Sequence, residues 1–152
     1  RGTAALQKKD IMAFLTPQEL ETHLYKEHIE VISREDTTIL SAAIDAAVSE
    51  AKGYLAAFDR DRIFTATGGQ RNALLLIFVK DIAVWHFVNL CNAGTDLSLR
   101  QDRYDRAIAW LKAVQKGDVS PDLPQLDADG DGQADMAGAV QFGSNPKRVQ
   151  HF

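Results

Sequence analysis

One apolar run constrains the fold of this chain more than any other feature. The stretch ALLLIFVKDIAVWHFVNL, Ala73–Leu90, is 18 residues long and apolar at most positions. A helix that is apolar on nearly every face is typical of the centre of a bundle. Because Lys80, Asp81 and His86 interrupt the run, we interpret it as a buried core helix and expect no association with a membrane. We therefore predict that it is the central helix, beginning near Gln70 or Arg71, with Ile82 and Trp85 in the core.

The charged residues of this run need partners, since a buried lysine or aspartate is costly unless it is paired. We expect Lys80 and Asp81 to form an ion pair with an arginine or aspartate of the following helix, or to lie on the surface of an oligomer. A catalytic lysine is the remaining alternative.

Helical signals also surround the central run. Thr16, Pro17 and Glu19 form a predicted capping box and first turn, of a helix that continues to about Tyr25. A short helical turn is expected at EHIEVIS, and apolar residues recur every three or four positions from Asp36 to Phe58. A last long helix is predicted from near Ser98 to a stop at Gly117. Since no run alternates with a period of two, the sequence predicts an all-α fold, a compact bundle of about four main helices with an irregular C-terminal extension.

The length of 152 residues suits a single domain. We expect residues 1–11 to be an added or disordered segment, because MAFLTPQEL, beginning at Met12, has the form of a natural start. We predict no signal peptide, because RGTAALQKKDI lacks the apolar core of one. Residues 12–117 are predicted to form the helical domain. Residues 118–152 are predicted to form a polar extension rich in Asp, Gly and Pro that ends in a C-terminal arm.

No catalytic motif is visible in the sequence, and we predict that the protein is not an enzyme. The four histidines lack the spacing of a zinc site, and Cys91, the single cysteine, is interpreted as a small core residue rather than a nucleophile. A net charge of −4 argues against a protein that grips nucleic acid through its phosphates or reads a base sequence.

The stretch LDADGDGQAD resembles the first half of a calcium loop. Calcium prefers six to eight oxygen ligands, and Gly132 permits the sharp turn between them. Gly138 stands where a bidentate glutamate would complete the site, so we expect weak binding, with a Kd of about 10⁻⁴–10⁻³ M. The alternative is an acidic, flexible turn without metal. Calcium is the one cofactor that we predict, and its candidate ligands are Asp127, Asp129, Asp131, the backbone carbonyl of Gln133, and Asp135.

Several segments, taken in order, resemble a known family. They are AFLTPQEL, ILSAAIDAAVSEAKGYLAAFD, KDIAVWHFV, RYDRAIAWLKAVQKGDVSPDLP and FGSNPKRVQHF. This set resembles the small head–tail connector, adaptor or neck family of Mu-like phages and prophages. The resemblance implies a structural virion protein, made in the host bacterial cytoplasm, that forms a ring in the neck. The ring would be twelve-fold, would bind the portal and the tail or neck proteins, and would let DNA pass. It implies no catalytic residues.

Physical reasoning favours the same function. A DNA conduit benefits from acidic charge that repels phosphates, and a ring needs two different surfaces that bind each other repeatedly. The extension carries Phe142 and Phe152, which suit an arm that docks on a neighbour. The alternative function is a stand-alone calcium-binding helical module for protein interaction.

Overall fold

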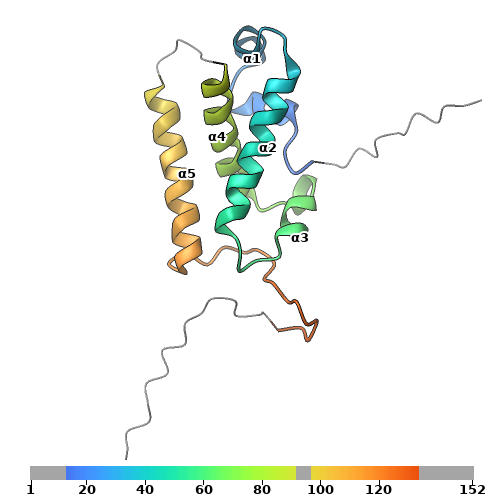
Figure 1. The fold of residues 1–152 in the computed structure, drawn as a ribbon. Coiled ribbons are helices and arrows are strands. Elements are labelled where there is room, and N and C mark those ends of the chain that lie inside the picture. Colours follow the sequence, from blue (N-terminus) through green and yellow to red (C-terminus); the bar gives the residue numbers. More distant parts are fainter. Residues whose placement is uncertain (1–12, 92–96, 134–152) are drawn as a thin grey trace, which may run out of the picture.

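The computed structural model describes residues 13–91 and 97–133 of the chain. Within these ranges the backbone forms helices, turns and one isolated bridge between Phe58 and Gln125, without a β-strand (Figure 1). The predicted all-α bundle is therefore confirmed. The elements in chain order are η1 (Pro17–Thr22), α1 (Lys26–Ser33), α2 (Thr37–Tyr54), α3 (Arg60–Thr65), η2 (Gly68–Gln70), α4 (Ala73–Leu90) and α5 (Ser98–Lys116), where η marks a 3₁₀ turn and α an α-helix.

Helix α4 is the centre of the bundle, as the apolar run predicts. It lies between α2 and α5 (Figure 1). By length and composition alone α4 could cross a membrane, a test that the core helix of a soluble protein also passes. Eight of its residues are buried against the other elements: Leu75, Val79, Lys80, Ile82, Ala83, Val84, Phe87 and Val88.

Small side chains bring α2 close to α4. Ala43, Ala47 and Ala51 lie four residues apart on one face of α2, and none of them is exposed to solvent. Residues four apart share a helix face, so this alanine stripe lets the two backbones approach closely. Asp36 caps the helix by accepting a hydrogen bond from the Thr38 N–H at 3.0 Å. The helix ends at Tyr54, short of the predicted Phe58, and the next residue, Leu55, is fully buried.

The connection between α2 and α4 holds a helix that the sequence pattern did not predict. Asp59 caps α3 by accepting from the Arg62 N–H at 3.1 Å, and the ring of Phe64 packs edge-on against that of Phe14 at 5.0 Å. Near the N-terminus, η1 is shorter than the predicted helix and α1 is longer than a single turn. Helix α4 begins at Ala73, two or three residues later than expected, because Asn72 accepts a hydrogen bond from the Leu75 N–H.

The first part of the C-terminal extension is docked on the bundle. Helix α5 ends at Gly117, which has the left-handed backbone (φ 85°) of a helix stop, as predicted. Beyond it the chain crosses the end of the bundle below α2 and α3 (Figure 1). The Asp59 N–H donates to the Pro124 carbonyl at 2.9 Å, the Leu126 N–H donates to the Ala57 carbonyl at 3.3 Å, and Leu123 is buried in the core. Burial of Leu123 ties the segment down up to Leu126.

Candidate functional site

The acidic loop, residues 127–133, folds around its own carboxylates. Asp127 accepts hydrogen bonds from the N–H groups of Gly130 and Gly132 at 2.8 and 3.0 Å. Asp129 accepts from Asp131 N–H at 3.2 Å, and Asp131 accepts from Gln133 N–H at 2.7 Å. Gly130 and Gly132 have positive φ, which glycine adopts without strain. Asp129 and Asp131 therefore each form an Asx turn, and Asp127 closes the loop through the N–H groups three and five residues on.

The same loop gathers ligands of the kind that calcium prefers. One carboxylate oxygen from each of Asp127, Asp129 and Asp131 lies within 4.8 Å of the others, and all three residues are exposed. This spacing fits a small cation bound by hard oxygen ligands. Gln133 ends the described loop and presents its N–H to Asp131, while Asp135 lies outside the described residues. Three of the five predicted ligands are thus brought together.

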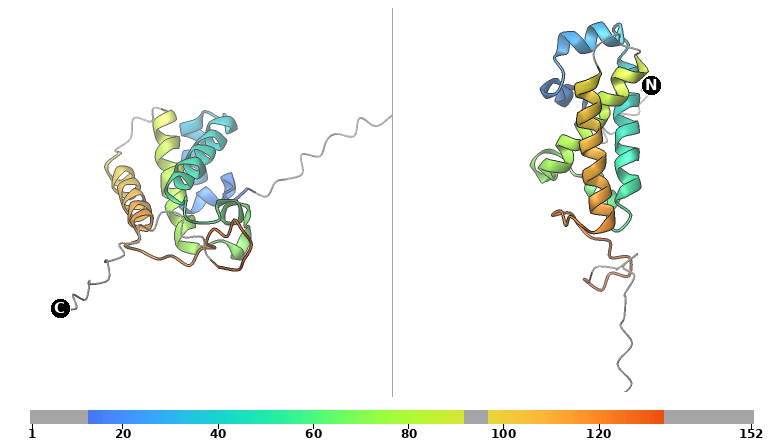
Figure 2. Two further views of the ribbon diagram at one scale, coloured as in Figure 1. Left: turned by 60° about the horizontal axis from the view of Figure 1, so that its bottom comes forward. Right: turned by 90° about the vertical axis from the view of Figure 1, so that its left-hand side faces the viewer.

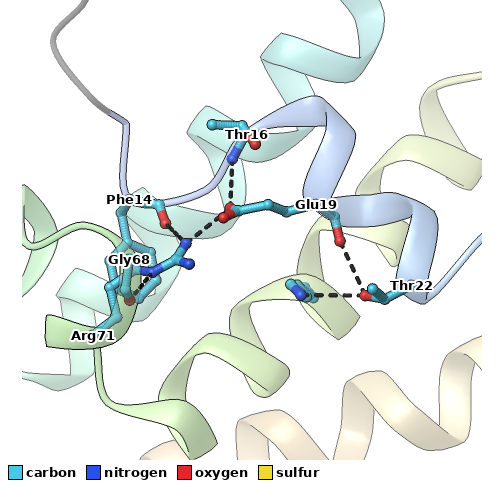
Figure 3. Close-up of polar contacts among 7 residues, drawn as sticks. Phe14, Thr16, Glu19, Thr22, Gly68 and Arg71 are labelled. Atoms are coloured by element: carbon cyan, nitrogen blue, oxygen red, sulfur yellow. Dashed lines mark hydrogen bonds and ion pairs between the residues drawn. The ribbon is translucent and has the colours of Figure 1, made fainter.

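Arg71 fastens the N-terminal segment to the start of α4 (Figure 3). Its guanidinium donates to the Phe14 carbonyl and the Glu19 carboxylate, both at 2.8 Å, and to the Gly68 carbonyl at 3.0 Å. Glu19 also accepts from the Thr16 N–H at 3.1 Å, which forms half of the predicted capping box. The hydrogen bond from Arg71 lowers the pKa of Glu19.

Lys80 and Asp81, the charged residues in the middle of α4, contact residues of η1 and directly after it. Lys80 is 9% exposed and donates to the Thr22 hydroxyl at 3.2 Å. Asp81 lies 3.4 Å from His23 Nε2. The prediction of a direct ion pair with the following helix is therefore wrong for Lys80, whose hydrogen bond goes to η1.

Arginines of α5 surround the Asp81–His23 contact. Burial raises the pKa of Asp81, and the positive charges of Arg103 and Arg100 oppose that rise. Burial also lowers the pKa of His23, so that the neutral imidazole is favoured. Arg100 donates to the His23 carbonyl at 3.1 Å. Within residues 13–91 and 97–133, Arg103 makes no hydrogen bond or direct ion pair, although it is half-buried.

Adjoining pockets between α5 and the η1–α1 region form one arginine furrow, which we define by Thr22, His23, Arg100, Arg103 and Arg106. One pocket of about 420 Å³ and another of about 280 Å³ share Thr22, His23 and Arg103. A third, of about 370 Å³, meets the furrow at Arg100 and has mostly apolar walls: Leu24, Val31, Ile32, Val88 and Leu99. The furrow thus combines guanidinium groups with an apolar end.

A second polar cluster joins α2, α4 and α5. Glu50 contacts His86 Nε2 at 2.7 Å and accepts a hydrogen bond from the Tyr104 hydroxyl at 2.5 Å. The ring of Tyr104 stacks on that of Trp85, with centroids 5.5 Å apart. Burial, followed by the hydrogen bond to Glu50, raises the pKa of Tyr104 well above its ordinary value. This cluster satisfies the polar atoms where three helices meet.

The sequence alone did not bring out the arginine furrow. Its members come from two segments about 80 positions apart, His23 and Arg103, and residues so far apart show no spacing that a motif search detects. The sequence feature that could have indicated the furrow is an arginine at every third position of the last helix: Arg100, Arg103 and Arg106.

A sequence model of the family described as bacteriophage Mu, Gp36 matches residues 6–139 of this chain. The match covers the helical bundle and the acidic loop. Comparisons with curated proteins and with solved structures gave no match.

Proposed function

The chain belongs to the bacteriophage Mu Gp36 family, and from this premise we propose that it is a head–tail connector, a structural protein of the virion neck. In this role the protein forms a ring between the portal and the tail, through which DNA passes. It acts through its surfaces and not as an enzyme.

The observation that carries this proposal is the family match, which runs through every described element of the fold from η1 to the acidic loop. A family of phage proteins points to virion assembly. Several segments of the chain also resemble small connectors, which supports a position in the neck.

The surface charge supports the proposal. The chain has a net charge of −4. A lumen with an acidic lining repels DNA phosphates, so that DNA slides through without being bound. The small bundle, about 30 Å along its longest helices of 18 and 19 residues, is also of a size suited to one protomer of a ring.

Deletion of the gene from a Mu-like prophage, followed by induction, tests the function. We expect DNA-filled heads and free tails that fail to join, because the connector between them is missing. Expression of the full chain from a plasmid should restore tailed, infectious particles. Normal joining in the deletion strain would refute the proposed role, and a strain that carries the plasmid without the gene is the control.

The acidic loop favours a second candidate function, calcium binding by a helical protein-interaction module. We propose that the loop binds calcium weakly through Asp127, Asp129 and Asp131, whose carboxylates lie within 4.8 Å of one another. The backbone carbonyl of Gln133 and the side chain of Asp135 would complete the set of protein ligands. Calcium would offset the repulsion between the carboxylates and stiffen the loop while the helices stay unchanged.

Calorimetric titration with Ca²⁺ tests this site. The wild-type protein should bind with a Kd of about 10⁻⁴–10⁻³ M, and the Asp129→Asn/Asp131→Asn variant should release no binding heat. Sedimentation in Ca²⁺ and in EDTA then separates the candidates. A calcium-driven change of size in a protein that is dispensable for head–tail joining favours the module.

A further inference from the structure

Two described surfaces of this chain have opposite charge and lie at different ends of the bundle. We infer that the acidic loop of one copy docks in the arginine furrow of a neighbouring copy. This names the contact by which the ring proposed above would close, and it rests on that proposal.

The arginine furrow has unused capacity to bind an acidic group. Arg103 lines two of its pockets, is half-buried and has no direct ion pair within the described residues. Arg106 pairs with Asp102 at 3.1 Å, but both side chains are more than half exposed, so the pair is open to exchange. Burial lowers the pKa of the Arg100 guanidinium, the neighbouring charge of Arg103 adds to this effect, and the carboxylate of Asp81, which lines the same furrow, opposes it. A carboxylate that enters the furrow would relieve repulsion between Arg100 and Arg103.

The acidic loop is the matching surface. Asp127, Asp129 and Asp131 are exposed, and none of them has a basic partner in residues 13–91 or 97–133. Their hydrogen bonds come from backbone N–H groups of the loop itself. Beside them, Leu126 is half-buried, so a partner that covers the loop also covers an apolar side chain.

The two surfaces cannot meet within one copy as the bundle stands. The loop extends beyond the end of the bundle that is opposite to α1, whereas the furrow lies between η1, α1 and the first half of α5 (Figures 1 and 2). A contact between two different surfaces repeats from copy to copy in one direction, and it closes into a ring where the rotation permits. Oppositely charged patches also set the register of such a contact.

Charge reversal in the full chain tests the inference. The furrow variant is Arg103→Glu/Arg106→Glu, and the loop variant is Asp129→Lys/Asp131→Lys. The matched controls are Arg60→Glu/Arg62→Glu on α3 and Asp45→Lys/Asp61→Lys, which make the same charge changes at exposed positions elsewhere. A negative charge at position 103 would repel Asp81. If circular dichroism shows that the furrow variant does not fold for this reason, the variant Arg103→Gln/Arg106→Glu is used instead.

Sedimentation velocity in EDTA, at ~20 and ~300 mM NaCl, measures self-association while salt screens the charges. Wild-type protein should associate at low salt and dissociate at high salt. For each variant alone, the association constant should fall at least about tenfold, which corresponds to about 1.4 kcal/mol of association free energy. An equimolar mixture of the two variants should associate again, because each reversed surface then meets an opposite one, and the control variants should behave as wild type.

Wild-type protein that remains monomeric at ~1 mM and low salt would overturn the inference, as would a mixture that does not recover or controls that are equally impaired. These results bear on the contact alone. The deletion strain tests the connector role separately. If the mixture of variants does not associate but the deletion strain still fails to join heads and tails, the proposed contact is wrong and the proposed function stands.

Discussion

Replacement of Arg71 by alanine should destabilise the bundle more than any other substitution of an arginine on its surface. The side chain is 10% exposed and is shared between the Phe14 carbonyl, the Gly68 carbonyl and the Glu19 carboxylate. A hydrogen bond that involves a charged group contributes about 1.5–3 kcal/mol when it is buried. The bond to Gly68 is exposed and the carboxylate of Glu19 is 31% exposed, so both contributions are reduced by solvent.

We therefore expect Arg71→Ala to lower the free energy of unfolding by about 2–4 kcal/mol. The largest share comes from the lost hydrogen bond to the part-buried Phe14 carbonyl. Arg71→Lys should lose about 1–2 kcal/mol, because an ammonium cannot span three acceptors in the plane of a guanidinium. Arg60, which is exposed on α3, is the matched control and should change stability by less than about 0.5 kcal/mol when replaced by alanine.

Urea unfolding followed by the fluorescence of Trp85 and Trp110, with circular dichroism as a second probe, measures these differences at pH 7. A double-mutant cycle with Glu19→Gln should give a coupling energy above about 0.5 kcal/mol. Equal stability of the Arg71→Ala and Arg60→Ala proteins would contradict this prediction, because Arg71 would then contribute no more than an ordinary surface arginine.

Three further predictions concern the same bundle. Ile82→Ala should cost about 2–5 kcal/mol, because the side chain is fully buried, whereas Leu74→Ala, at a side chain that is 46% exposed, should cost under about 1 kcal/mol. Because the pKa of Glu19 is lowered in the folded state, the ionised carboxylate stabilises the fold fully above the unfolded pKa of about 4.3. This stabilisation is lost as the pH falls below that value, so the difference in stability between wild type and Glu19→Gln should shrink on acidification. The raised pKa of Tyr104 means that wild type should lose stability above about pH 10, and Tyr104→Phe should lose less over that range; identical alkaline unfolding would contradict this.

The sequence predicted the elements whose signals are local. Caps, stops and the apolar run placed α4 and α5 to within a few residues, and Gly117 marked the end of α5. The short helix α3 was not predicted because six residues are too few to show a helical period. Its aspartate cap, Asp59, is visible only once the hydrogen bond to Arg62 N–H is known.

The faces of α4 could not be predicted, because a helix that is apolar all round has no amphipathic direction. The structure buries Lys80, exposes Leu74 and Ile77 by 46% each, and leaves Trp85 half-buried, stacked on Tyr104 and outside the core cluster. The expectation that Trp85 lies in the core is therefore wrong in part. Tertiary contacts from η1 and α5 decided these positions, and they depend on residues far away in the sequence.

The two candidate sites also differ in whether the sequence could locate them. The acidic loop was located from the sequence because its ligands lie within a few residues of one another, around glycines that permit tight turns. The arginine furrow requires η1 to be folded against α5, so it emerges only in three dimensions.

Cryo-electron microscopy of the neck in tailed particles of a Mu-like phage that carries this gene tests the connector role most directly. We expect a closed ring of helical bundles between the portal and the tail, in which α4 lies inside each bundle and the acidic loop of each copy reaches the arginine furrow of the next. A neck that holds no copy of this bundle, in particles that are joined and infectious, would contradict it.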